Sequence, residues 1–137
     1  MPNTKTLTFV LMDAPFENAR TATAFRLLDS AARKGFNLKV FAYEGAVGLA
    51  FARQSPHANA VHGRDVEEED HPLSRKWVQG LQETTAQNGG QLEWVNCGLC
   101  VDERGMDECI EGVTRGSPAD MLRFVNESDN TLVIPTR

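Results

Sequence analysis

Two cysteines separated by two residues are the part of this sequence best suited to covalent chemistry. Cys97 and Cys100 lie in the stretch WVNCGLCVDERGM, after a segment typical of a β-strand and before one typical of a helix. At such a junction unpaired backbone N–H groups and the helix dipole stabilise a thiolate, the reactive form of cysteine. Arg104, nearby, can hold a negative persulfide or lower the pKa of a thiol. The same spacing also fits two small buried residues beside a sheet, so both interpretations stay open.

Metal binding and disulfide exchange are further chemistries of a C-x-x-C pair. A zinc site needs more ligands, and the sequence has no second C-x-x-C. The available histidines are His57, His62 and His71, which all lie in the polar stretch QSPHANAVHGRDVEEEDH, expected to be a long surface loop. Cys109 is the third cysteine, and its surroundings predict a half-buried packing residue in a helix. A thioredoxin-type exchange site is a weaker match, because the aromatic and proline neighbours of that motif are missing.

Composition argues against several classes of function. The chain has 137 residues, 41% of them hydrophobic, which suits a single domain spanning residues 1–137. Its net charge of −5 gives little electrostatic support for binding nucleic acid. The apolar run near the N-terminus is too short for a signal peptide or a membrane span, so we expect a cytoplasmic protein that does not bind membranes.

The hydrophobic pattern predicts the elements that must position these cysteines. Strands are predicted over residues 6–12, 38–43, 91–95 and 130–135, and helices over 17–34, 45–53, 73–88, 98–103, 107–111 and 118–127. Ser117 is the expected N-cap of the last helix. Alternating strands and helices indicate a parallel sheet covered on both faces, with functional residues beyond the carboxyl ends of its strands. Asp13, Glu44 and Cys97 all fall at such ends.

The arrangement of motifs resembles that of the DsrE/DsrF-like family. The opening LTFVLMDAPFENARTATAFRLLDSAARKG, the segment VFAYEGAVGLAFARQ and the stretch NCGLCVDERGMDECIEGVTRGSPADML carry the resemblance, which covers nearly the whole chain. In the sulfur-relay branch of that family, an active cysteine follows a strand and precedes the glycine of a basic turn by eight residues. Cys97 stands eight residues before Gly105, and Arg104 matches the basic residue before the glycine. Cys100 and the histidine-rich loop depart from the family's pattern.

The resemblance implies both a fold and a reaction. The fold is a flavodoxin-like α/β three-layer sandwich with a mainly parallel central sheet, usually assembled as a homotrimer or homohexamer. The reaction is sulfur transfer, in which Cys97 accepts sulfane sulfur as a persulfide from a donor protein and passes it to the thiol of an acceptor protein. Cys100 then either resolves a persulfide or disulfide on Cys97 or binds a metal with it, and no organic cofactor is required.

Three hypotheses follow from the sequence. A sulfur carrier, or sulfurtransferase acting by a cysteine persulfide, predicts an accessible and acidic Cys97. A metal- or partner-binding module would use the histidine loop together with Cys97 and Cys100. A structural subunit would keep all three thiols packed and inert.

Overall fold

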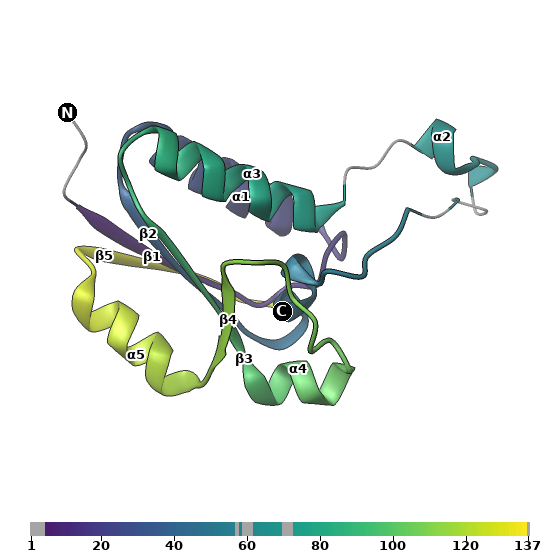
Figure 1. Cartoon of the computed structure of the whole chain (residues 1–137). Coiled ribbons are helices and arrows are strands. Elements are labelled where there is room, and N and C mark those ends of the chain that lie inside the picture. The colour runs from purple at the N-terminus through teal and green to yellow at the C-terminus, as the bar shows by residue number, and fades with distance from the viewer. Residues whose placement is uncertain (1–4, 57, 59–61, 70–72, 137) are drawn as a thin grey trace.

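The computed structural model describes residues 5–56, 58, 62–69 and 73–136, and its elements alternate between strands and helices (Figure 1). The strands are β1 (Thr6–Leu11), β2 (Asn37–Ala42), β3 (Leu92–Cys97), β4 (Val113–Gly116) and β5 (Asn130–Ile134). The helices are α1 (Ala19–Arg33), the 3₁₀ helix η1 (Glu44–Ala50), α2 (Val66–Glu69), α3 (Ser74–Gln87), α4 (Gly98–Arg104) and α5 (Pro118–Glu127). None of these helices combines the length and the apolar character needed to span a membrane.

The five strands form one parallel sheet in the order β4-β3-β2-β1-β5. Its register aligns Leu11 of β1 with Ala42 of β2, and Cys97 of β3 with Gly116 of β4. Because every strand runs in the same direction, the residues that follow β1, β2 and β3 gather at one edge of the sheet.

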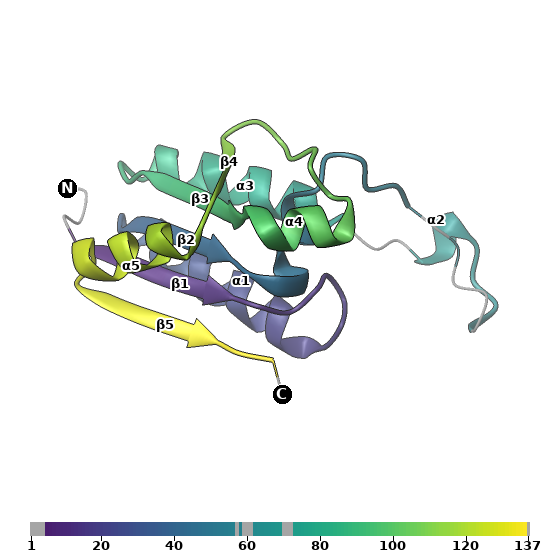
Figure 2. The same cartoon turned by 90° about the horizontal axis from the view of Figure 1, so that it is seen from below.

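Helices cover both faces of this sheet. Helices α1 and α3 lie together on one face, and α4 and α5 lie on the other (Figures 1 and 2). This arrangement is the flavodoxin-like α/β sandwich that the sequence predicts, with a parallel central sheet.

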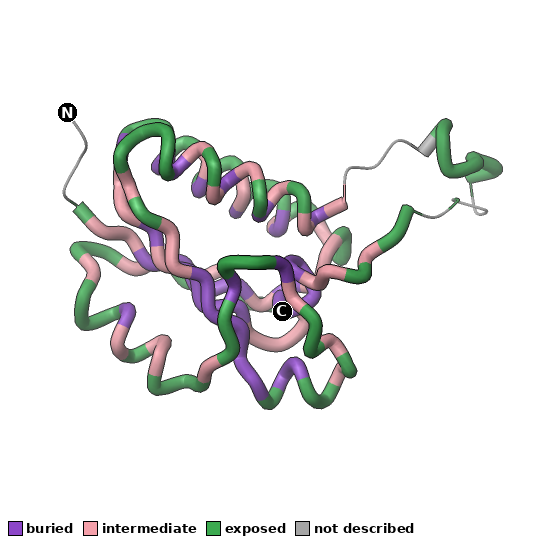
Figure 3. The backbone as a smooth tube through the Cα atoms, viewed as in Figure 1, coloured by how far each residue is buried: buried purple, intermediate pink, exposed green. Residues whose placement is uncertain are grey.

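Strand residues alternate between two cores. On β3, Trp94 packs into the core under α1 and α3, whereas Val95 and Cys97 pack into the core under α4 and α5. On β2, Val40 packs into the core under α1 and α3, and Phe41 packs into the core under α4 and α5. Buried residues accordingly follow the strands through the middle of the molecule (Figure 3). Because successive side chains of a strand point to opposite faces of the sheet, the Cys97 side chain points to the face that α4 and α5 cover.

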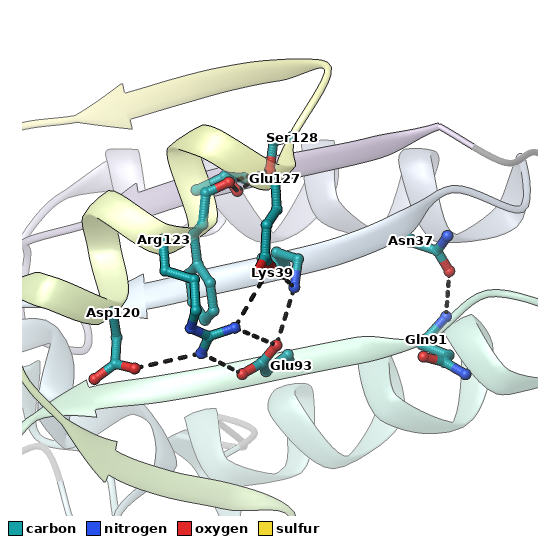
Figure 4. A network of polar contacts seen from close by, with 10 residues as sticks. Asn37, Lys39, Gln91, Glu93, Asp120, Arg123, Glu127 and Ser128 are labelled. Atoms are coloured by element: carbon teal, nitrogen blue, oxygen red, sulfur yellow. Dashed lines mark hydrogen bonds and ion pairs between the residues drawn. The ribbon is translucent and has the colours of Figure 1, made fainter.

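Charged contacts hold α5 against β2 and β3. Ser117 caps the helix in a capping box with Asp120, as the sequence predicts. Arg123 bonds to Glu93 of β3 at 2.7 Å, and Lys39 of β2 bonds to the same carboxylate at 3.0 Å (Figure 4). The hydrogen bond from Arg123 lowers the pKa of Glu93. These contacts seat Phe124 of α5, which is fully buried, in the core that contains Cys97 and Cys100.

Two predictions near the C-terminal half were wrong. The sequence predicts four strands, but the structure has a fifth, β4, which is a short edge strand with two exposed residues and therefore has no apolar run to reveal it. The helix predicted over 107–111 is absent from this described segment. Its backbone is held extended, because Ala52 N–H donates to the Glu108 carbonyl and Ile110 N–H donates to the Ala50 carbonyl.

The connection between η1 and α3 differs in detail from the prediction. The helix predicted over 45–53 is the 3₁₀ helix η1, which ends at Ala50. The polar stretch that follows contains the single-turn helix α2, which projects away from the sheet in Figure 1. His62 lies just before α2, whereas His57 and His71 lie outside the described residues.

Candidate functional site

Cys97 lies where β3 ends and α4 begins, at the carboxyl edge of the sheet. It is the last residue of β3 and the N-cap residue of α4. Only 2% of its surface is exposed, so the accessible thiol expected from the sequence is not what the structure shows. Within the described part of the chain, its side chain makes no capping hydrogen bond to α4. Its surroundings are instead a core shared with Val10, Phe41 and Val95.

Cys100 lies beside Cys97 in the same core. It is 4% exposed and belongs to the same buried cluster as Cys97. The backbone N–H of Glu44 also donates to the Cys100 sulfur at 3.2 Å. Burial is the main cause that raises the pKa of Cys100; the Glu44 N–H opposes it, and the neighbouring Cys97 adds to it. Near neutral pH Cys100 is therefore a protonated thiol that shares its core with a second cysteine.

Arg104 acts on this site through Glu44. Its Nη2 donates to the Glu44 carboxylate at 2.9 Å, and its Nη1 donates to the Cys100 carbonyl at 3.2 Å. Glu44 has φ 52°, a left-handed conformation that is unfavourable for a residue with a side chain. The ion pair with Arg104 holds Glu44 where its N–H meets Cys100. Arg104 thus contacts oxygen atoms, and its place in the site is that of a positioning residue.

Arg115 is a site residue that the sequence does not reveal. It lies on β4, next to Asn96 and one residue before the partner of Cys97. Its guanidinium covers Gly98, where an added Cβ would come within 2.6 Å of the Arg115 Nε. Asp102 binds both terminal nitrogens, at 2.7 and 2.6 Å, and chiefly raises the pKa of Arg115, with a smaller contribution from the charge of Cys97. Because no apolar run marks β4, the sequence does not predict that Arg115 lies beside Cys97.

Tyr43 is a second residue that the sequence does not reveal. Its ring stacks on Phe41 with centroids 6.4 Å apart and packs against the core that holds both cysteines. The negative charge of Glu44 is the main cause that raises the pKa of Tyr43, and Cys100 adds to it. Its only sequence signal is its position directly after β2, at the same edge of the sheet as Cys97.

A polar cavity of about 760 Å³ opens next to the cysteines at the carboxyl ends of β1 and β2. Glu44 and Arg104 form part of its wall, and both also bond to Cys100. Asp13, predicted to lie at this edge, lines the cavity and is buried; a 2.8 Å hydrogen bond from Arg20 lowers its pKa. Two residues that line the cavity, Glu44 and Arg104, therefore also contact Cys100.

The remaining candidates lie apart from this site. Cys109 packs at the margin of the opposite core, where it pairs with Phe51 in an isolated bridge, and burial raises its pKa. It is half-buried as predicted, although not helical. Over residues 5–56, 58, 62–69 and 73–136, no three His, Cys, Asp or Glu side chains gather to hold a metal. The candidate ligands His57 and His71 are outside these residues, so metal binding stays an alternative hypothesis.

Curated relatives match this chain over most of its length. An uncharacterised protein of Methanopyrus kandleri is 30% identical over 128 residues, which cover 92% of this chain and 91% of the relative. An uncharacterised protein of Methanocaldococcus jannaschii is 27% identical over 127 residues, which cover 91% of this chain and 96% of the relative.

Solved structures share the fold. The ychN protein of E. coli superposes with a TM-score of 0.74 at 19% identity, covering 95% of this chain and 99% of that one. A conserved protein of unknown function from Bacteroides thetaiotaomicron superposes with a TM-score of 0.56 at 13% identity, covering 95% of each chain. The DsrE/DsrF-like family model matches residues 5–134, and the chain therefore belongs to this family, which is generally associated with sulfur relay.

Proposed function

We propose that this protein is a sulfur carrier that accepts sulfane sulfur as a persulfide on Cys97 and passes it to an acceptor thiol. The observation that carries the proposal is the burial of Cys97 and Cys100 together in one core at the carboxyl edge of the sheet, in a protein of the DsrE/DsrF-like family. Edges of this kind are where parallel α/β sheets bind and transform ligands.

Two features favour Cys97 as the carrier. The raised pKa of Cys100 keeps it protonated near neutral pH, and the thiolate is the form that attacks. Arg115 interacts electrostatically with Cys97 and can stabilise a negative persulfide there. Arg104 contributes indirectly, by holding Glu44 against Cys100.

The reaction consists of two sulfur transfers. In the first, the Cys97 thiolate attacks the outer sulfur of a donor persulfide, and the donor leaves as a thiolate. In the second, an acceptor thiolate attacks the outer sulfur of the Cys97 persulfide, and the Cys97 thiolate leaves. Each transfer exchanges one sulfur between thiols, so no organic cofactor takes part.

Sulfur must reach a thiol that is only 2% exposed. The cavity of about 760 Å³ is the route that the structure offers, because its wall residues Glu44 and Arg104 also contact Cys100. A shift of Glu44, whose backbone is held in an unfavourable conformation, would open this wall. We therefore expect loading to be slower than for an exposed cysteine.

The proposal extends to partners and assembly. Donor and acceptor proteins would exchange sulfur with Cys97 in the reducing cytoplasm, where thiols stay free. Assembly of this single-domain chain as a homotrimer or homohexamer is supported by exposed apolar residues on α5 and on the edge strand β5, namely Leu122, Val125, Leu132 and Val133.

Intact-mass spectrometry tests the proposal directly. Reduced protein is incubated with polysulfide under anaerobic conditions, and Cys100→Ser is compared with Cys97→Ser and with Cys109→Ser as the matched control. A gain of about 32 Da per sulfur is expected in Cys100→Ser and not in Cys97→Ser. Loading that is absent in Cys100→Ser, or equal in all variants including Cys97→Ser, would overturn the sulfur-carrier proposal.

A further inference from the structure

We propose that Cys100 discharges the Cys97 persulfide within the same molecule, releasing sulfide and leaving a Cys97–Cys100 disulfide. The inference rests on the proposed function, because it needs sulfur on Cys97. It adds an activity, reductive release of sulfane sulfur, to the transfer between thiols.

The placement of the two sulfurs favours this step. Both thiols already lie inside one buried core. Residues three apart on a helix have Cβ atoms about 5–6 Å from each other. A disulfide spans about 3.5–4.5 Å between Cβ atoms, so the two cysteines must approach by about 1–2 Å to be joined. A shift of this size at the start of α4, where Cys97 is the N-cap residue with an extended backbone, would bring Cys100 onto the inner sulfur of a Cys97 persulfide.

The step is balanced in atoms and electrons. The Cys100 thiolate attacks the Cys97 Sγ, the new Cys97–Cys100 bond forms, and the bond from Cys97 to the outer sulfur breaks. The outer sulfur takes the electron pair and leaves as hydrosulfide, and the proton of the Cys100 thiol balances the charge. The sulfane sulfur is reduced by two electrons while the two cysteines are oxidised by two. An external dithiol reductant is the co-reactant that returns both cysteines to thiols.

Two contacts equip Cys100 for this role. The Glu44 N–H lies 3.2 Å from the Cys100 sulfur, where it stabilises the thiolate that attacks. The Arg104 hydrogen bond to the Cys100 carbonyl fixes the backbone of the attacking residue.

Burial decides the competition between discharge and transfer. Cys97 and Cys100 are 2% and 4% exposed, so an acceptor protein reaches the persulfide only after the wall of the cavity opens. Cys100 needs no such opening. Sulfide release is therefore the expected fate of sulfur on Cys97 whenever no acceptor is docked.

The test follows sulfide and protein mass together. Reduced, full-length protein is mixed anaerobically with polysulfide, sulfide is trapped as its bimane adduct, and remaining thiols are alkylated before intact-mass and peptide analysis. The wild type is expected to lose about 2 Da, show a Cys97–Cys100 linkage and release one sulfide per disulfide above the Cys100→Ser background. Cys100→Ser and Cys100→Ala are expected to keep about 32 Da of added sulfur instead. Cys109→Ser should behave like the wild type.

The outcomes separate this inference from the sulfur-carrier proposal. If both Cys100 variants load sulfur and the wild type holds its added sulfur equally long, internal discharge is overturned and the carrier stands. If the added sulfur moves to Cys100 without sulfide release, internal discharge is likewise overturned. If the wild type forms the disulfide while neither Cys100 variant loads sulfur, both proposals fail, because the disulfide then arises by direct oxidation. Serine keeps an acceptor for the Glu44 N–H, and alanine removes it, so agreement of the two variants excludes a folding artefact.

Discussion

The backbone N–H of Glu44 donates a hydrogen bond to the sulfur of Cys100, joining the start of η1 to α4. The contact is carried by the main chain, so the side chain of Glu44 remains available to bind Arg104 at 2.9 Å. The same residue therefore contacts the buried dithiol on one side and the polar cavity on the other. It is the structural link between the cavity and the sulfur chemistry.

Stability is expected to fall at alkaline pH because of Cys100. Its pKa is raised in the folded protein, chiefly by burial, whereas the pKa of the thiol in the unfolded chain is about 8.5. Above that pH the unfolded state binds fewer protons than the folded state, so the free energy of unfolding decreases until the folded thiol also ionises. Thermal unfolding between pH 7 and about pH 10 under reducing conditions measures this slope.

The comparison for this prediction is Cys100→Ser. Tyr43 and Cys109 also have raised pKa values, so the variant keeps part of the alkaline decline. Its slope should nevertheless be shallower than that of the wild type. Identical slopes would mean that burial of Cys100 does not penalise its thiolate.

Substitution at Gly98 is expected to displace Arg115. In Gly98→Ala the new Cβ would lie 2.6 Å from the Arg115 Nε, so the guanidinium must move or the start of α4 must shift. Because the Arg115 side chain is half exposed and can move aside, the expected loss is up to about 1 kcal/mol, the value of the surface ion pair with Asp102 that the shift disturbs. Chemical denaturation measures the loss.

Gly80→Ala is the matched control for this steric effect. Gly80 lies inside α3 with no atom within 4 Å of an added Cβ in the described structure. The alanine should stabilise the protein by up to about 1 kcal/mol, because glycine is a poor helix former. Equal destabilisation by both substitutions would contradict the close packing of Arg115 on Gly98.

The charge of Arg115 is expected to promote sulfur loading. Removing the cation in Arg115→Gln, in a Cys100→Ser background, should slow loading of Cys97 about two- to fivefold, the effect of a partly exposed charge interaction. Arg33→Gln removes an exposed arginine from α1 and should leave the rate unchanged. Rapid-quench experiments followed by intact-mass spectrometry measure both loading rates. If Arg115→Gln in this background loads sulfur as fast as Cys100→Ser alone, then Arg115 does not assist the loading of Cys97.

Asp13 is expected to stabilise the fold except in acid. Its side chain is 5% exposed and bonds to Arg20 at 2.8 Å, so Asp13→Asn should cost about 1.5–3 kcal/mol at neutral pH. The pKa of Asp13 is lower in the folded protein than in the unfolded chain, where it is about 4. This contribution to stability is therefore present above the unfolded-state pKa and is lost as the pH falls through the folded-state pKa. Denaturation curves at pH 7 and in acid measure the difference.

Asp29→Asn provides the exposed counterpart. Asp29 makes an ion pair of the same 2.8 Å length with Arg33, but its side chain is 47% exposed. Its loss should change stability by less than about 0.5 kcal/mol. Similar effects at positions 13 and 29 would show that the Asp13 pair is as solvated as a surface pair.

The sequence by itself determined four of the five strands, most of the helices and the cysteine pair. The apolar run TLTFVLM marks a buried parallel strand regardless of its neighbours, and Ser117 followed by proline marks the start of α5. The position of Cys97 at the carboxyl end of a strand follows from the same pattern. These features depend on local preferences, which short stretches of sequence encode.

Tertiary structure alone decided the strand β4, the extended backbone at residues 107–111 and the identity of the residues around the thiols. Val113–Gly116 is a strand because β3 offers it a hydrogen-bonding edge, and Arg115 reaches Gly98 only because of that pairing. The contact between the Glu44 N–H and the Cys100 sulfur joins segments on two neighbouring elements whose distance no local pattern specifies. The burial of Cys97 has the same origin, since it results from α4 and α5 closing over the sheet rather than from the residue itself.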